Sequence, residues 1–183
     1  MILVTGATGR VGYRLMEALA DARADVAAMV RVEARADDLP GTPRHVVATL
    51  DKPPAAAVLR EFDRIFLLSP EIEEQAELET VFIDAVTVAG HRPHIVKICA
   101  DGFQDPGCDV RFMRAHQQVA RHLDAVGLPV TYLAAATYME NLLDDAAEIQ
   151  STGEIRAADR PVPDRDGAGY GRDLHQARHR VPR

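Results

Sequence analysis

Short apolar segments alternate with segments of helical periodicity from residue 1 onward, and this alternation constrains the fold more than any other feature. Strands are predicted at residues 1–5, 25–30, 45–50, 64–69, 94–100 and 130–135. Helices are predicted at residues 10–21, 54–61, 70–89, 110–126 and 138–150. The predicted strands are continuous apolar runs, which is typical of strands that helices cover on both faces. The sequence therefore predicts a doubly wound α/β fold, Rossmann-like, with a parallel sheet of about six strands.

The sequence changes character at about residue 151. Residues 154–183 contain seven arginines, three glycines and three prolines, and they carry no apolar stripe of either period. Such a segment buries too little apolar surface to offset the entropy that it loses on ordering. We therefore predict a Rossmann domain at residues 1–150 and a poorly ordered, Arg-rich tail at residues 151–183.

Composition and charge exclude several classes of protein. The 183 residues are 47% hydrophobic and 27% charged, as in a globular domain and unlike a disordered chain. No apolar run approaches the roughly 18 residues that a membrane span needs, and Met1 is not followed by a basic signal-peptide segment. The formal charge of -7 argues against a nucleic-acid partner. The chain has only two cysteines, without CxxC spacing, which favours a reducing compartment, so we expect a cytoplasmic protein. We expect no membrane partner, and the sequence does not reveal the oligomeric state.

Three glycines, Gly6, Gly9 and Gly12, follow the first predicted strand and open the first predicted helix. In a dinucleotide-binding loop the first glycine permits a tight turn, the second admits the pyrophosphate, and the third allows close packing. The helix N-terminus then presents amides and the positive end of its dipole to the phosphates. The alternative is a turn of structural glycines without a ligand, but the position after the first strand favours a dinucleotide. The residues predicted to hold the pyrophosphate are Gly6, Thr8, Gly9, Arg10, Val11 and Gly12.

An arginine stands where an acidic residue would favour NAD(H). In NAD-binding proteins a carboxylate about 20 residues beyond the glycines binds the ribose 2′-hydroxyl. Here the second predicted strand ends at Val30, and Arg31 follows it. Arg31 and Arg10 could bracket a 2′-phosphate; the alternative is that both are solvated surface residues. We therefore predict NADP(H) in preference to NAD(H).

Several stretches together resemble the NmrA-like family of atypical short-chain dehydrogenases/reductases. Besides the glycine spacing, they are residues 66–70 (FLLSP), residues 95–98 (IVKI), the Ala115-His116 pair and residues 138–143 (YMENLL). The resemblance covers residues 1–150 and implies an NAD(P)-binding Rossmann domain. It also implies an NAD(P)H-dependent oxidoreductase that transfers hydride to a quinone-like or azo small-molecule acceptor. The family includes redox-sensing regulators that bind the cofactor without turnover.

The chain departs from the family pattern at the expected ligand crevice. Family members usually continue into a region that closes over the substrate, so we expect this chain to be C-terminally shortened. Alanines stand at residues 134–136 where the family tends to have Arg-Pro-Gly, and Ala48 and Thr49 replace a Gly-Asp pair. A non-catalytic NADP(H)-sensing protein and a defective truncated paralogue are therefore the alternative hypotheses.

Few side chains are candidates for chemistry. None of the four tyrosines has a lysine four residues on, so carbonyl reduction by a Tyr-x-x-x-Lys pair is not expected. Quinone reduction does not require this pair, because the cofactor supplies the hydride and the protein mainly positions the nicotinamide and quinone rings. His116 is the candidate proton donor because its ordinary pKa is near physiological pH; the alternative is a packing histidine. Leu68, Ser69 and Cys99 are predicted beside the nicotinamide ribose, with a buried, inert thiol as the alternative for Cys99.

Two further predictions concern the segment after the fourth strand and metal ions. Ser69 and Pro70 predict a helix start, since serine can cap a helix and proline fits its first position. A run of acidic residues is then predicted to lie in the opening turns, facing water without forming an acid–base pair. This run comprises Glu71, Glu73, Glu74, Glu77 and Glu79. The histidine pairs at 91/94 and 175/179 lack a third ligand, so no metal site is predicted.

Overall fold

A computed structural model describes residues 1–41, 43–108, 110–136, 138, 143, 146–156 and 178–180. Its contacts divide the chain into two compact units, Met1–Ala135 and Ala136–Arg183. The first unit contains the sheet and the glycine loop. No helix among the described residues is long and apolar enough to cross a membrane.

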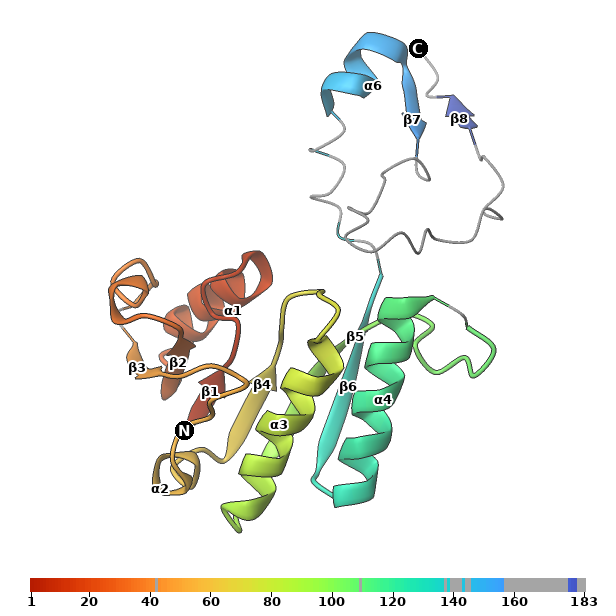
Figure 1. Cartoon of the computed structure of the whole chain (residues 1–183). Coiled ribbons are helices and arrows are strands. Elements are labelled where there is room, and N and C mark those ends of the chain that lie inside the picture. Colours follow the sequence, from red (N-terminus) through yellow and green to blue (C-terminus); the bar gives the residue numbers. More distant parts are fainter. Residues whose placement is uncertain are drawn as a thin grey trace. The chain divides into compact units, whose positions relative to one another are not determined.

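The first unit is built on a six-stranded sheet in which every pair of neighbouring strands is parallel (Figure 1). Its strands are β1 (Ile2–Val4), β2 (Val26–Val30), β3 (Arg44–Val47), β4 (Arg64–Leu67), β5 (His94–Ala100) and β6 (Val130–Ala135). They lie in the order β3-β2-β1-β4-β5-β6. The chain thus moves outward from β1 to β3, then crosses back to β4 and continues in the opposite direction. This confirms the predicted doubly wound parallel fold and places its topological switch point between β1 and β4.

Helices cover both faces of this sheet. They are α1 (Arg10–Asp21), α2 (Ala56–Leu59), α3 (Gln75–Val88) and α4 (Arg111–Val126), with a 3-10 turn η1 (Glu33–Arg35) after β2. Successive side chains of a strand point to opposite faces, and the core follows this rule. Leu3 packs in one cluster with Phe82 of α3 and Leu123 of α4, whereas Val4 packs in another with Met16 of α1. Figure 1 shows α3 and α4 side by side along β4, β5 and β6.

Two glycines end helices where the sequence predicts it. Gly127 caps α4 with φ of 68° and donates its amide to Leu123 and Asp124 carbonyls. Gly90 follows the α3 cap with φ of 73°. Left-handed backbone of this kind is accessible to glycine at low cost, and it turns the chain toward the next strand.

The prediction that a helix begins at Ser69 and Pro70 is wrong. α3 begins at Gln75, and the segment before it is held by turn hydrogen bonds from the Ile72 amide to Pro70 and from the Gln75 amide to Ile72. The Ser69 hydroxyl does not cap the helix, because it donates to the buried carboxylate of Glu79 instead. The helix predicted at 54–61 is shorter, Ala56–Leu59, and the strand predicted at 45–50 is Arg44–Val47.

The second unit contains three described elements. α6 (Ala146–Thr152) overlaps the end of the helix predicted at 138–150, most of whose remaining residues lie outside the described part of the chain. β7 (Glu154–Arg156) pairs antiparallel with β8 (Arg178–Arg180) within the segment where no regular element was predicted. Residues 157–177 and 181–183 of the expected tail lie outside the described residues. The division of the chain between residues 150 and 151 stays a prediction.

Candidate functional site

The glycine loop lies at the switch point, against the carboxyl end of β4. Gly6 has φ of 61°, and a Cβ placed on it would lie 3.0 Å from the Leu68 carbonyl oxygen. The neighbouring Thr5 fastens β1 to β4: its Oγ1 donates to the Leu68 oxygen and accepts from the Leu68 amide, both at 2.8 Å. Gly6 is therefore required both by its backbone conformation and by the close approach of the two strands.

The N-terminus of α1 opens directly from this loop. Gly9 is its N-cap residue, no side chain caps the helix, and no acidic residue lies in its first turn. The Gly9 amide donates to the Gly6 carbonyl, which closes the loop beneath the helix end. A helix end of this kind, with its positive dipole uncompensated by acids, has the chemistry of an anion site.

Gly12 is the most tightly enclosed glycine of the loop. A Cβ built on it would lie 2.1 Å from the Gly6 carbonyl oxygen and 2.8 Å from the Ala7 Cα. Both are backbone atoms, which cannot turn away as a side chain can. The close packing that the third glycine allows is therefore between α1 and the loop itself.

The two arginines predicted to hold a 2′-phosphate lie at neighbouring strand ends. Arg31 is exposed in a bend directly after β2, and Arg10 is the exposed first residue of α1, which follows β1. Because β1 and β2 are adjacent and parallel, both arginines lie at the carboxyl edge of the sheet. This is the edge at which open α/β sheets bind their ligands.

The other predicted cofactor residues lie at the ends of β4 and β5. Leu68 and Ser69 are half-buried directly after β4, and Cys99 lies near the end of β5 with 1% of its surface exposed. Burial raises the pKa of the Cys99 thiol to about 11. A thiol in this state holds little thiolate at neutral pH, as the inert alternative requires.

His116 faces the core from α4. Its exposed fraction is 8%, and its Nδ1 has no hydrogen-bond partner among the residues that the structure describes. Burial, with a smaller contribution from the positive charge of Lys97, lowers the pKa of His116 to about 4. The imidazole is therefore neutral at physiological pH, and it lacks the ordinary pKa on which its selection as a proton donor rested.

The buried, neutral His116 predicts a pH dependence of stability. Because its pKa is lower in the folded than in the unfolded chain, the unfolded chain binds the proton first as pH falls. Neutral His116 therefore contributes roughly 3 kcal/mol to the free energy of unfolding. This contribution is complete above the unfolded pKa of about 6.5 and is lost as the pH falls toward about 4. We expect His116→Phe to remove this part of the slope in urea unfolding measured between those pH values. His45→Phe, at a ring 33% exposed, is the control; equal slopes in wild type and His116→Phe would contradict the assignment.

Two buried charged residues escaped the sequence-based prediction. Glu79 has 0% and Lys97 1% of its surface exposed, and their Oε1 and Nζ atoms lie 3.0 Å apart. The prediction that Glu79 faces water is therefore wrong. A signal was present in both cases. Glu79 shares a helical stripe with Phe82, Ile83 and Val86, and Lys97 lies in the middle of an apolar strand that helices cover.

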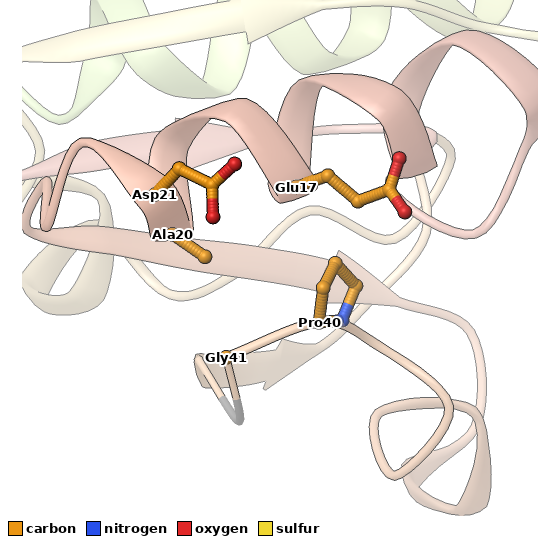
Figure 2. A pocket seen from close by; sticks show the side chains of 5 residues that line it. All are labelled: Glu17, Ala20, Asp21, Pro40 and Gly41. Carbon is orange, nitrogen blue, oxygen red and sulfur yellow. The ribbon is translucent and has the colours of Figure 1, made fainter.

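A surface hollow at the opposite end of α1 contains none of the predicted site residues (Figure 2). Its lining residues are Glu17, Ala20, Asp21, Pro40 and Gly41. Figure 2 shows the two carboxylates on one side of α1 and the proline on the loop that leads to β3. Among the described residues, no group of three His, Cys, Asp or Glu could hold a metal ion. The glycine loop and the neighbouring strand ends thus remain the candidate site.

The sequence profile of the NmrA-like family matches residues 1–168, which include the glycine loop and all six strands of the sheet. The chain belongs to the NmrA-like family. It is 32% identical over 169 residues to a (4-alkanoyl-5-oxo-2,5-dihydrofuran-3-yl)methyl phosphate reductase of Streptomyces griseus subsp. griseus, covering 88% of this chain and 57% of that protein. It is 27% identical over 158 residues to an NAD(P)H azoreductase of Xenophilus azovorans, covering 85% of this chain and 54% of that protein.

Solved structures show the same fold. An NADPH-dependent quinone oxidoreductase from Escherichia coli, in complex with NADPH, superposes with a TM-score of 0.72 at 24% identity, covering 84% of this chain and 55% of that one. A triphenylmethane reductase from Citrobacter sp., in complex with NADP(H), superposes with a TM-score of 0.67 at 19% identity, covering 82% and 55%. This NmrA-like chain therefore spans little more than half the length of the relatives that it matches.

Proposed function

We propose that this NmrA-like chain binds NADP(H) and carries the cofactor-binding half of an NAD(P)H-dependent reductase. The observation that carries the proposal is the glycine loop at the switch point, where the Gly6 and Gly12 backbones leave no room for a side chain. This loop ends in a helix N-terminus without an acidic residue in its first turn. The residues present thus fit a pyrophosphate, and two of the named relatives, the azoreductase and the quinone oxidoreductase, are described as NAD(P)H- or NADPH-dependent.

The proposed reaction is reduction of a quinone-like or azo acceptor. The bound cofactor supplies a hydride, and the chain binds the cofactor and orients it. The first turn of α1 would hold the pyrophosphate, Arg31 the 2′-phosphate, and Leu68 and Ser69 the nicotinamide half. At neutral pH neither buried candidate is an effective acid: His116, with a pKa lowered to about 4, is already neutral, and Cys99, with a pKa raised to about 11, holds its proton too tightly to donate it readily. The proton that accompanies the hydride would come from water.

The same two buried groups support the second candidate function, an NADP(H)-binding protein without turnover. The measurement that separates the two is the loss of NADPH absorbance in the presence of a simple quinone. A reductase oxidises NADPH at a rate proportional to protein concentration and forms an equal amount of hydroquinone. Binding of NADPH without such a rate would reject turnover by this chain and leave the cofactor-sensing function.

Cofactor preference gives a direct prediction about Arg31. Replacing it by alanine removes one charge-assisted contact with the 2′-phosphate, so the affinity for NADPH should fall by about 1–3 kcal/mol, or about 5- to 150-fold in Kd. The affinity for NADH, which lacks this phosphate, should stay unchanged. Arg64→Ala is the matched control, because Arg64 is also exposed but begins β4 at the opposite edge of the sheet. Equal losses for the two cofactors would contradict the role of Arg31.

A further inference from the structure

A buried polar network lies behind the end of β4. The Oε1 atom of Glu79, on α3, accepts hydrogen bonds from the Ser69 hydroxyl at 2.5 Å and from Lys97 Nζ at 3.0 Å. Lys97, on β5, also donates to the carbonyl of Ile98. Glu79 and Lys97 are fully enclosed, whereas Ser69 is only half-buried. Ser69 is therefore the end of the network that lies nearest to the surface.

Ser69 is fixed in the same edge of the sheet as the glycine loop. Leu68, the residue before it, exchanges two hydrogen bonds with Thr5, and Thr5 precedes Gly6. The Leu68 carbonyl and side chain lie against the position of a Gly6 Cβ. The hydroxyl of Ser69 thus stands at the carboxyl end of β4, beside the loop proposed to hold the pyrophosphate.

The network decides which kind of hydrogen bond Ser69 can still form. A hydroxyl has one proton to donate, and a carboxylate only accepts. Lys97, which only donates, supplies the positive charge that makes an ionised Glu79 tolerable in the interior. The one proton of Ser69 is consequently engaged by Glu79. The hydroxyl oxygen then has only acceptor capacity left for a ligand.

We propose that Glu79 and Lys97 are positioning residues: they engage the proton of Ser69 and fix its hydroxyl so that the oxygen accepts a hydrogen bond from the nicotinamide half of the cofactor. This inference rests on the proposed function, and it names the chemistry recognised: a donor on that half, which is either a nicotinamide-ribose hydroxyl or the carboxamide NH₂. A buried ion pair is a poor device for stability alone, since replacing such a pair by well-packed apolar residues of similar volume is often neutral or stabilising. The Glu79–Lys97 pair lies behind the half-exposed hydroxyl of Ser69, at the carboxyl end of β4. There it can orient this hydroxyl, which an apolar pair could not do.

The test compares three variants of the whole chain by calorimetry. Ser69→Ala removes the acceptor, the double variant Glu79→Leu/Lys97→Met releases the Ser69 proton without leaving a lone buried charge, and Ser69→Thr keeps the hydroxyl. We expect Ser69→Ala and the double variant each to weaken NADPH binding about 3- to 10-fold, the range for one hydrogen bond. Combining them in one chain should cause no further loss of affinity, because both act on the same contact. Ser69→Thr, which restores the hydroxyl, should recover most of the affinity that Ser69→Ala loses. Adenosine 2′,5′-bisphosphate, which lacks the nicotinamide half, should bind all variants equally.

An analogue of the oxidised cofactor with an acetyl group in place of the carboxamide identifies the donor. If the carboxamide NH₂ is the donor, Ser69→Ala weakens NADP⁺ and leaves the analogue unchanged; if a ribose hydroxyl is the donor, it weakens both. A double variant that melts cooperatively and binds NADPH as tightly as wild type overturns the inference. So do equal losses for NADPH and adenosine 2′,5′-bisphosphate, because these indicate general damage. Wild type that binds neither ligand overturns the proposed function and the inference together.

Discussion

Gly12→Ala is expected to abolish NADPH binding and to lower the free energy of unfolding by about 3 kcal/mol or more. The added Cβ would lie 2.1 Å from the Gly6 carbonyl oxygen and 2.7 Å from the Gly6 carbonyl carbon. Neither atom can move without shifting the loop that joins β1 to α1. The loop would then lose the geometry proposed for binding the pyrophosphate. Helix α1 would also lose its packing on the sheet. Calorimetric titration measures the loss of NADPH binding, and urea unfolding measures the loss of stability.

Gly9 and Gly90 supply the controls for this prediction. A Cβ on Gly9 meets only the Gly6 oxygen, at 3.3 Å, so Gly9→Ala should fold with a smaller loss of stability and still lose NADPH, whose pyrophosphate must approach there. A Cβ on Gly90 meets no atom within 4 Å; Gly90→Ala suffers only from its left-handed backbone, about 1–2 kcal/mol, and should bind NADPH normally. Gly12→Ala that unfolds at the same urea concentration as wild type would contradict the packing.

Lys97→Met is expected to lower the free energy of unfolding by about 3–5 kcal/mol, because it leaves the Glu79 carboxylate in the interior without its positive partner. This loss of stability should come from the unpaired charge of Glu79 and not from the change in side-chain shape. Adding Glu79→Leu to Lys97→Met removes the lone carboxylate, so the double variant should regain most of the stability. Urea unfolding at neutral pH compares wild type, the single variant and the double variant.

An ion pair on the surface serves as the matched control. Arg44 and Glu61 approach to 2.5 Å, closer than Lys97 and Glu79, but their side chains are 47% and 41% exposed. Water replaces the lost partner there, so Arg44→Met should change stability little. A double variant that is less stable than Lys97→Met alone would show that the buried pair contributes more than the cost of an unpaired charge.

The sequence predicted the sheet well because its signals are local. Most strands of this parallel sheet are apolar runs that can be found without knowledge of their neighbours; the edge strand β3, which begins with Arg44 and His45, is the one whose bounds differ most from the prediction. The glycine spacing likewise indicated the tight loop, and the predicted helix ends at residues 89 and 126 fall directly before Gly90 and Gly127. The structure adds which atoms require each glycine: a strand carbonyl for Gly6 and the loop backbone for Gly12.

The polar core could not be predicted by local rules. Serine before proline predicts a helix cap, but the Ser69 hydroxyl instead donates to Glu79, ten residues on. An acidic run predicts a solvated face, but Glu79 turns inward to Lys97, which lies 18 residues further along the chain. His116 was predicted as a proton donor from its ordinary pKa, but its pKa is lowered by burial and by Lys97 from another element. In each case a tertiary partner decides the chemistry.

The central claim, that this chain binds NADP(H) at its glycine loop, is tested most directly by calorimetric titration of the full chain with NADPH and with NADH. We expect NADPH to bind with micromolar affinity and NADH to bind more weakly, the difference disappearing in Arg31→Ala. A chain that melts cooperatively and binds neither cofactor would contradict the claim, because the fold would then be present without its site.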